Sequence, residues 1–250
     1  MNARDMSANA IELKNLAKHF DGVKAVDNLS LVIKKGTITS LIGPNGSGKT
    51  TLINLLSGIL PFDQGIVVIS GQLETRLRPY DVAALGLTRT FQEIRLFEQM
   101  SVLDNILVVL TERNIWSSLF EKHQARHLQK AEEVLSKVGL WPKRTHLASS
   151  LSYGQRRLLE IARVLAMNSE IILLDEPFVG LFPEVVKLVS GIIMEMKQQG
   201  KTIILIEHNM NLIRQLSDYV LVMDNGRLLA EGQPDKVLKN PAVIEAYLGE

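Results

Sequence analysis

The chain contains, at residues 38–56, the run ITSLI-GPNGSGKT-TLINLL. The first part is a short apolar stretch typical of a buried strand, and the last part has its apolar residues at helical spacing. The middle part, Gly43 to Thr50, matches the pattern GxxxxGK[ST] in the strand–turn–helix context that this pattern requires. The run therefore predicts a phosphate-binding loop and, with it, an α/β nucleotide-binding fold.

Each residue type in this loop suits a nucleotide. Glycines let the backbone curl so that its N–H groups point at phosphate oxygens, and the start of the following helix adds the positive end of its dipole. We expect Lys49 to contact the β- and γ-phosphates and the Thr50 hydroxyl to bind Mg²⁺. The predicted nucleotide-binding residues are Gly43, Pro44, Asn45, Gly46, Ser47, Gly48, Lys49, Thr50 and Thr51.

Composition excludes several classes of protein. The 250 residues suffice for one large α/β domain or two small ones, and 46% hydrophobic with 22% charged residues is typical of a globular chain. A net charge of +1 disfavours a general nucleic-acid binder, and the lack of cysteine excludes disulfides, cysteine-type zinc sites and thiol catalysis. The segment 1–10 lacks the apolar core of a secretory signal, and no apolar run approaches the ~18 residues of a membrane span. We therefore expect a cytoplasmic protein. If it acts at a membrane, it does so without entering the bilayer.

Short apolar runs bounded by turn residues predict strands that alternate with helical segments, as in a domain with a largely parallel core sheet. These runs are Ile11–Leu16, Leu29–Ile33, Ile38–Ile42, Ile171–Leu174, Ile203–Ile206 and Val220–Met223. Asp224-Asn225-Gly226 predicts a tight turn into a hairpin strand at Arg227–Ala230. Between about residues 95 and 167 the apolar residues follow helical spacing, which predicts a helical subdomain inserted in the nucleotide-binding core.

The strand Ile171–Leu174 ends in Asp175-Glu176-Pro177. Ligand groups in parallel sheets gather at the carboxyl ends of strands. We expect Asp175 to hold Mg²⁺ through water, and Glu176 to accept a proton from the water that attacks the γ-phosphate. Two adjacent carboxylates with no local basic partner favour a bound cation, the alternative being a solvated acidic turn.

A second candidate phosphate-binding motif is Leu151-Ser152-Tyr153-Gly154-Gln155, which precedes a helical stretch. Ser152 and Gln155 have capping-box spacing, which explains a helix start without any ligand. Gly154 in a first helical turn costs about 1 kcal/mol relative to alanine. A phosphate close to the backbone would account for it, since helix N-termini bind anions.

With the phosphate loop and Asp175-Glu176, this pentapeptide resembles the signature motif of the ATP-binding cassette (ABC) ATPases. The resemblance runs from Leu13 to Tyr247, with the motifs in the family order. It implies an α/β P-loop core of ABC type with an antiparallel β subdomain and an inserted helical subdomain, residues 1–250 forming a single ATP-binding domain. It also implies ATP hydrolysis between two cassettes, in which Ser152, Tyr153, Gly154 and Gln155 of one chain close over the γ-phosphate on the other.

The resemblance gives roles to three more residues and reveals one departure. Phe20 matches the aromatic residue that stacks on adenine, with a core aromatic at a strand end as the alternative. Gln92 matches the glutamine that contacts Mg²⁺ and the attacking water. His208 matches the switch histidine at the γ-phosphate, although a lone histidine is more often structural. The family usually has Asp or Asn where this chain has Phe182, in the loop that links the two nucleotide sites, which puts the usual polar contact there in question.

The stretches 22–26, 89–97, 158–163 and 240–249 are similar to the ATP-binding subunits of bacterial branched-chain (hydrophobic) amino-acid importers. This similarity implies two direct partners, a second ABC subunit (identical or a sister) and the membrane permease subunits. It also implies a periplasmic binding protein that acts indirectly, and a location on the inner face of the cell membrane. The candidates for a permease-docking surface, with internal packing as the alternative, are Ile94, Leu96, Phe97, Met100, Trp116 and Phe120.

Other functions stay open at this point. A lipopolysaccharide-export ATPase would share the Arg-Arg-x-x-Glu-Ile-Ala-Arg helix found at residues 156–163. A soluble cassette of translation or DNA repair would usually carry tandem cassettes or a long coiled coil, and residues 51–151 contain no sustained heptads. A GTPase or small-molecule kinase would lack the motif at 151–155, and the chain has no Asn-Lys-x-Asp sequence.

Overall fold

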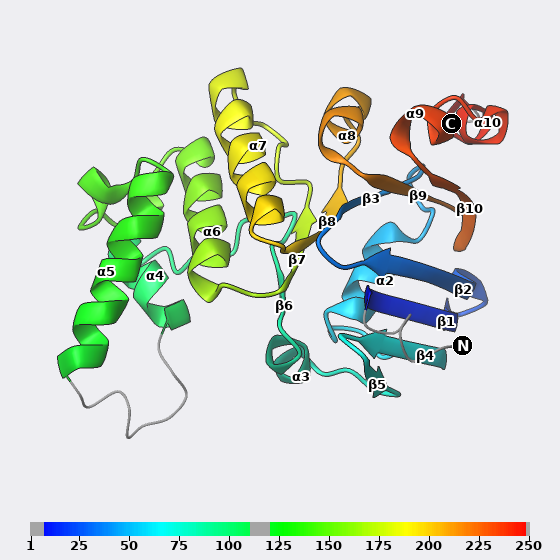
Figure 1. The fold of residues 1–250 in the computed structure, drawn as a ribbon, viewed down its shortest axis with the longest axis horizontal. Coiled ribbons are helices and arrows are strands. Elements are labelled where there is room, and N and C mark those ends of the chain that lie inside the picture. The colour runs from blue at the N-terminus through cyan, green and yellow to red at the C-terminus, as the bar shows by residue number, and fades with distance from the viewer. Residues whose placement is uncertain (1–7, 111–120, 249–250) are drawn as a thin grey trace. The chain divides into compact units, whose positions relative to one another are not determined.

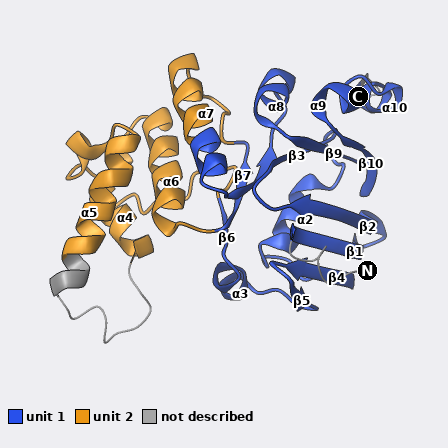
Figure 2. Cartoon of the chain, viewed as in Figure 1, with its two compact units in different colours: residues 1–89, 170–176, 193–250 blue, residues 90–169, 177–192 orange. Residues whose placement is uncertain are grey.

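The computed structural model describes residues 8–110 and 121–248, which divide into two compact units (Figures 1 and 2). Unit 1 comprises residues 1–89, 170–176 and 193–250, and unit 2 comprises residues 90–169 and 177–192. The described strands all belong to unit 1. Each unit has its own architecture and is treated separately.

A six-stranded sheet with the order β10-β9-β3-β8-β7-β6 forms the centre of unit 1. Its strands are β3 (Ile38–Ile42), β6 (Leu87–Arg89), β7 (Ile171–Asp175), β8 (Thr202–Ile206), β9 (Tyr219–Asp224) and β10 (Arg227–Gly232). Neighbouring strands pair in parallel except β9 and β10. Every residue of β3, β7 and β8 is buried, and their continuous apolar runs suit parallel strands covered on both faces.

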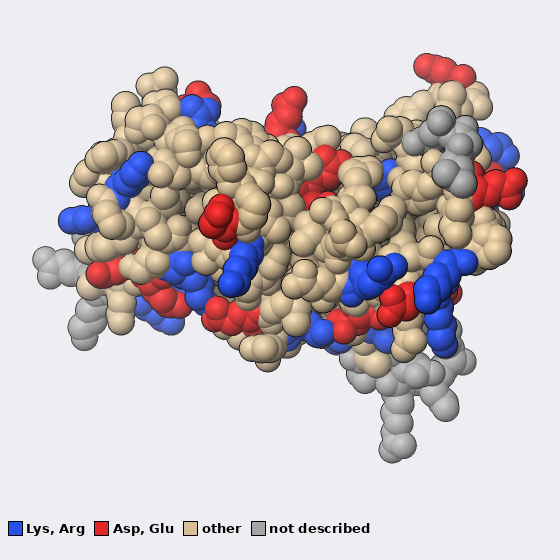
Figure 3. Space-filling model, turned by 90° about the horizontal axis from the view of Figure 1, so that it is seen from above, with Lys and Arg blue, Asp and Glu red and all other residues tan. Residues whose placement is uncertain are grey.

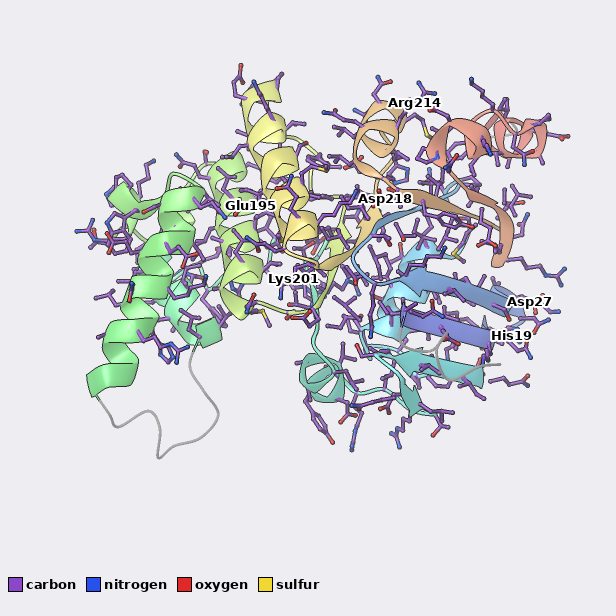
Figure 4. All side chains as sticks on the ribbon, in the orientation of Figure 1. His19, Asp27, Glu195, Lys201, Arg214 and Asp218 are labelled. Carbon is purple, nitrogen blue, oxygen red and sulfur yellow. The ribbon has the colours of Figure 1, made fainter. Side chains whose placement is uncertain are left out.

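A second, antiparallel sheet in unit 1 has the order β2-β1-β4-β5. Its strands are β1 (Asn9–Phe20), β2 (Val23–Lys34), β4 (Gln64–Ile69) and β5 (Gln72–Glu74). Near the β1–β2 turn, His19 and Asp27 lie beside each other (Figure 4), and Asp27 accepts a hydrogen bond of 2.6 Å from Arg227 of β10. The Arg227 guanidinium lowers the pKa of Asp27 and fastens this sheet to the edge of the other one.

The apolar core of unit 1 has two parts, because alternate residues of a strand point to opposite faces. Leu41 of β3 belongs to a cluster that joins both sheets to helix α2 (Lys49–Leu56). Its neighbour Ile42 belongs to a second cluster with residues of the C-terminal helices. The other helices of unit 1 are α3 (Pro79–Ala84), α8 (Met210–Leu216), α9 (Pro234–Val237) and α10 (Pro241–Leu248).

Unit 2 is helical in its described part. It contains α4 (Val102–Leu110), α5 (Glu121–Lys137), α6 (Tyr153–Met167), the 3₁₀ turns η2 (Trp141–Lys143) and η3 (Ala148–Ser150), and the first part of α7 (Pro183–Gln198). Helix α6 begins with the predicted capping box, since the Gln155 N–H donates to Ser152 Oγ and the Ser152 N–H donates to Gln155 Oε1.

The predicted strands and helices are confirmed, although several boundaries differ. The run Ile11–Leu16 is the middle of the longer β1, and the predicted hairpin is the antiparallel pair β9–β10. Sequence analysis did not place β4, β5 and β6, which are short or only partly apolar, nor the helices α3, α7, α8, α9 and α10. Trp116 and Phe120 lie outside the described residues.

The surface agrees with the balanced composition. On the face drawn in Figure 3, Lys and Arg side chains are interspersed with Asp and Glu side chains, as a net charge of +1 leads one to expect. Among residues 8–110 and 121–248, no helix combines the length and the apolar character that crossing a bilayer requires.

Candidate active site

The predicted phosphate loop lies between β3 and α2, at the carboxyl end of a central strand. Gly48 is the N-cap of α2 and has φ 99°, and a Cβ there would come within 2.2 Å of the Ala25 carbonyl oxygen, so only glycine fits. No side chain in the described chain caps the start of α2. The start of a helix is where the motif predicts that backbone N–H groups meet a phosphate.

Lys49 folds back over this loop. Its ammonium donates hydrogen bonds to the carbonyl oxygens of Gly43 at 2.7 Å and Pro44 at 2.8 Å, and the residue is buried. The positive charge therefore lies inside the curled backbone, where phosphate oxygens would meet it. Thr50 is exposed beside it.

Asp175, at the end of β7, has a partner that sequence analysis missed. Arg89 Nη2 donates to Asp175 Oδ2 at 2.9 Å, and both side chains are buried. The same guanidinium donates to Asn54 and Ser57, which lie in and after α2. The expectation that these carboxylates lack a basic partner is therefore wrong: an arginine from the neighbouring strand β6 supplies one, and it ties β7 to the helix that follows the phosphate loop.

Glu176 and His208, predicted separately, lie together. His208 Nε2 and Glu176 Oε1 are 2.9 Å apart, and the Glu176 N–H donates to the Ile206 carbonyl at the end of β8. Glu176 has φ 49°, a left-handed conformation that costs a non-glycine residue energy and is concentrated at functional sites. The buried Glu207 accepts hydrogen bonds from the N–H groups of His208 and Asn209, which sets the turn that carries His208.

The remaining predicted residue of unit 1 is Phe20, at the end of β1. Its ring is 40% exposed, and the Lys18 ammonium lies 5.3 Å from the ring centroid. The alternative of a core aromatic is therefore wrong for this residue, and a flat apolar surface is available for stacking.

The signature residues and Gln92 belong to unit 2. Ser152 and Tyr153 are exposed at the start of α6, and a Cβ on Gly154 would meet Leu181 only at an ordinary contact distance of 3.8 Å. Nothing in the described chain therefore demands glycine at this position. Gln92 is exposed in the irregular segment between β6 and α4.

Tyr153 packs against the loop that contains Phe182. A Cβ on Gly180 would come within 2.9 Å of the Tyr153 ring, so the ring lies flush against this glycine. Phe182 itself is 76% exposed, unusually high for so large an apolar side chain. Phe182, where the family usually has Asp or Asn, is thus an exposed apolar side chain on the surface of unit 2.

Tyr247 in α10 is a further site residue that sequence analysis did not assign to the loop. Its hydroxyl accepts a hydrogen bond of 2.7 Å from the Gly43 N–H, at the start of the phosphate loop. No local signal reveals this contact, because 204 residues separate the two partners.

A cavity of about 580 Å³ lies elsewhere in unit 1, and residues of β1, β2, Thr37, Thr39, Tyr219 and Glu231 line it. None of the predicted nucleotide-binding residues is among them. The predicted phosphate loop lies instead after β3, a central strand of the six-stranded sheet.

Comparisons with known proteins agree with this geometry. Residues 26–179 match the family model described as ABC transporter, and residues 227–250 match the model described as branched-chain amino acid ATP-binding cassette transporter. The chain is 39% identical over 254 residues to the high-affinity branched-chain amino acid transport ATP-binding protein LivG of Escherichia coli, covering 98% of this chain and all of that protein. It is 35% identical to the corresponding protein BraF of Pseudomonas aeruginosa, with 98% and 100% covered.

Solved structures give the same result. A nucleotide-free ATP-binding cassette from an ABC transporter superposes with a TM-score of 0.84 at 34% identity, covering 97% of this chain and all of that one. A dimeric cassette in a post-hydrolysis state, bound to ADP and phosphate, has a TM-score of 0.78 at 25% identity, with 90% and 98% covered. These matches confirm the resemblance that the motifs indicate. The chain belongs to the ABC transporter family, and within it the chain is an ATP-binding cassette that acts as an ATPase.

Proposed function

We propose that the chain is the energy-coupling ATPase subunit of an importer of branched-chain or other hydrophobic amino acids. Relatives named as branched-chain amino acid transport ATP-binding proteins match nearly its whole length, and the C-terminal match at residues 227–250 is specific to that group. The observation that carries the hydrolytic part is the Glu176–His208 pair at the ends of β7 and β8, beside the strand that leads into the phosphate loop.

The chemistry follows from the side chains of the loop and the strand ends. Phe20 stacks on adenine, and the Lys49 ammonium exchanges the carbonyls of Gly43 and Pro44 for the β- and γ-phosphate oxygens of ATP. Glu176 accepts the proton of the attacking water, and His208 holds this carboxylate in place through its hydrogen bond. The bond between the γ-phosphorus and its bridging oxygen breaks, which gives ADP and phosphate.

The donor set at the loop suits Mg²⁺. Oxygen atoms are the ligands this ion prefers, and the Thr50 hydroxyl, the Asp175 carboxylate and the Gln92 amide oxygen would supply them in the proposed site. The described residues contain no group of three or more His, Cys, Asp or Glu side chains that could hold a metal ion. When bound, Mg²⁺ neutralises charge on the β- and γ-phosphates.

A second cassette, identical or a sister, completes the site in this proposal. The start of α6, with the exposed Ser152 and Tyr153 and the half-buried Gly154 and Gln155, closes over the γ-phosphate held by the other chain. The space around Gly154 supports this, because close approach of a phosphate would explain a glycine that this chain itself does not require.

The membrane permease is the other proposed partner, with the chain in the cytoplasm on the inner face of the membrane and a periplasmic binding protein acting indirectly. Of the candidate docking residues, Phe97 and Met100 are exposed, whereas Ile94 and Leu96 are half-buried. The exposed Leu147 adjoins them, because the neighbouring Ala148 N–H donates to the Met100 carbonyl. We therefore place the docking surface at Phe97, Met100 and Leu147.

Reconstituted transport tests the proposal. The chain is co-expressed with its permease subunits and placed in vesicles with the cassette facing outward and the binding protein and leucine enclosed. ATP added outside should then drive leucine out of the vesicles. Lys49→Ala should abolish this transport by removing the charge on the phosphates. Lys130→Ala, at a half-buried lysine on α5 that pairs with the exposed Glu133, is the control. ATP hydrolysis without amino-acid transport, or recovery with ribosomes and no permease, would contradict it.

A further inference from the structure

Among the residues that the structure describes, the largest fully buried side chain is an arginine, Arg157 on α6, which is only 1% exposed. Burying a guanidinium is costly unless its donors are satisfied. Arg157 and Glu160 lie three residues apart on one face of the helix, and Arg157 Nη1 donates to Glu160 Oε2 at 2.7 Å. Neither residue has a part in the hydrolytic chemistry described above.

Arg157 and Glu160 together bind the backbone of two consecutive residues, Phe91 and Gln92. Arg157 Nη1 donates to the Phe91 carbonyl at 3.0 Å, and Arg157 Nη2 donates to the Gln92 carbonyl at 2.9 Å. Glu160 Oε1 accepts the Phe91 N–H at 3.3 Å. Residues 91–100 form no helix or strand, so these contacts replace the backbone pairing that a regular element would provide.

The same guanidinium reaches the signature motif. Arg157 Nη2 lies 3.3 Å from the Tyr153 hydroxyl, and the Tyr153 ring packs on Gly180. One buried group thus contacts both the residue at the start of α6 and the backbone of Gln92, and all of these residues belong to unit 2. Burial raises the pKa of Glu160, while Arg157 acts in the opposite direction. Arg157 therefore favours the charged form of this buried carboxylate.

We infer that Arg157 and Glu160 are positioning residues that direct the side chain of Gln92 and couple it to the signature turn of α6. This inference rests on the proposed function of Gln92 in ATP hydrolysis. A displacement of the start of α6, where the second cassette is proposed to close, is transmitted through one guanidinium to the peptide that carries Gln92. The pair acts through Gln92 and does not touch the nucleotide.

A double-mutant cycle on the transport-competent complex tests this inference. Arg157→Met with Glu160→Met removes both charges together, which avoids leaving one buried charge unpaired. We expect kcat for ATP hydrolysis to fall about 10–100-fold, as for other losses of positioning, with KM for ATP nearly unchanged. In a Gln92→Ala background the same pair of substitutions should lower kcat no further, because its effect passes through Gln92.

Arg156→Met is the matched control: Arg156 is the neighbouring half-buried arginine on α6, but it donates to the Ser149 and Leu151 carbonyls and pairs with Glu98. It should lower kcat by the same factor with and without Gln92. If the Arg157/Glu160 double variant does not fold, Arg157→Lys replaces it, since lysine keeps the charge but cannot reach both carbonyls and Glu160.

Three results would overturn the inference: equal loss of kcat with and without Gln92, an unchanged kcat in the double variant, or an unchanged kcat in Gln92→Ala. Failure of the proposed function is distinguishable, because the unmodified complex would then show no ATP-driven transport at all.

Discussion

At the scale of single residues, the candidate site is held together by contacts between residues far apart in the chain. Asp175 is paired with Arg89, Glu176 with His208, and the first glycine of the phosphate loop with Tyr247. Each of these partners comes from a different element, so the loop and the strand ends are fixed from several directions. Positioning of this kind is what phosphoryl transfer demands, since most of its catalysis is placement and charge.

The hydrogen bond to Tyr247 leads to a prediction. Tyr247→Phe removes the acceptor for the N–H of the buried Gly43, which should cost about 1 kcal/mol of unfolding free energy and weaken ATP binding by distorting the loop. Urea unfolding and equilibrium nucleotide titration measure the two effects. Tyr80→Phe, at an exposed tyrosine of α3, should change neither. Unchanged ATP affinity in Tyr247→Phe would contradict a role of this tyrosine in shaping the loop.

At the scale of elements, the start of α6 serves two purposes. The capping box of Ser152 and Gln155 begins the helix without any ligand, while Lys143 also donates to Gln155 Oε1 at 3.1 Å. The same exposed turn is proposed to meet a phosphate on another chain. The two purposes are separable, because the cap needs only a side-chain acceptor, whereas the phosphate needs a donor.

Substitution of Ser152 separates them. Ser152→Ala should lower the unfolding free energy by about 0.5–1 kcal/mol and also impair hydrolysis. Ser152→Asp keeps a capping acceptor and should restore stability, but its carboxylate has no proton to donate to a phosphate and should leave hydrolysis impaired. Thermal unfolding and steady-state ATPase assays provide the readouts. Normal hydrolysis by both Ser152 variants, the destabilised and the stable one, would exclude Ser152 from the phosphate site.

At the scale of the whole molecule, one chain carries one phosphate loop and one signature turn. Phe182 and Tyr153 are both exposed in unit 2, and the Tyr153 ring packs on Gly180, two residues before Phe182. Exposed apolar side chains that gather on a surface mark interaction sites. The similarity to a dimeric cassette bound to ADP and phosphate agrees with a function in pairs. Assembly should therefore depend on ATP and should outlast it when hydrolysis is blocked.

Glu176→Gln tests this dependence. The amide cannot accept the proton of the attacking water, so the variant should bind ATP, turn over at least about 100-fold more slowly, and accumulate as a two-cassette complex. Light scattering after gel filtration, with and without ATP, measures the mass. Glu133→Gln, at an exposed residue of α5, should behave like the unmodified chain. A monomer with slow turnover would separate the base role of Glu176 from ATP-driven pairing.

Local patterns determined much of this protein from the sequence alone. The phosphate loop, the capping box, the Asn-Gly hairpin and the buried runs of β3, β7 and β8 depend on neighbours within a few residues, so periodicity and turn chemistry reveal them. The order of the motifs indicated the family. The strands β4, β5 and β6 escaped because short or half-polar strands are stabilised by their sheet neighbours and carry little signal of their own.

Tertiary structure alone decided which groups meet. The order β3-β8-β7 brings the ends of β7 and β8 together and so pairs Glu176 with His208, although 32 residues separate them. It also supplied Arg89 as the partner of Asp175, buried Arg157 against the backbone of Gln92, and left Phe97 exposed while half-burying Leu96. Such contacts depend on how distant elements pack, and no spacing along the chain encodes them.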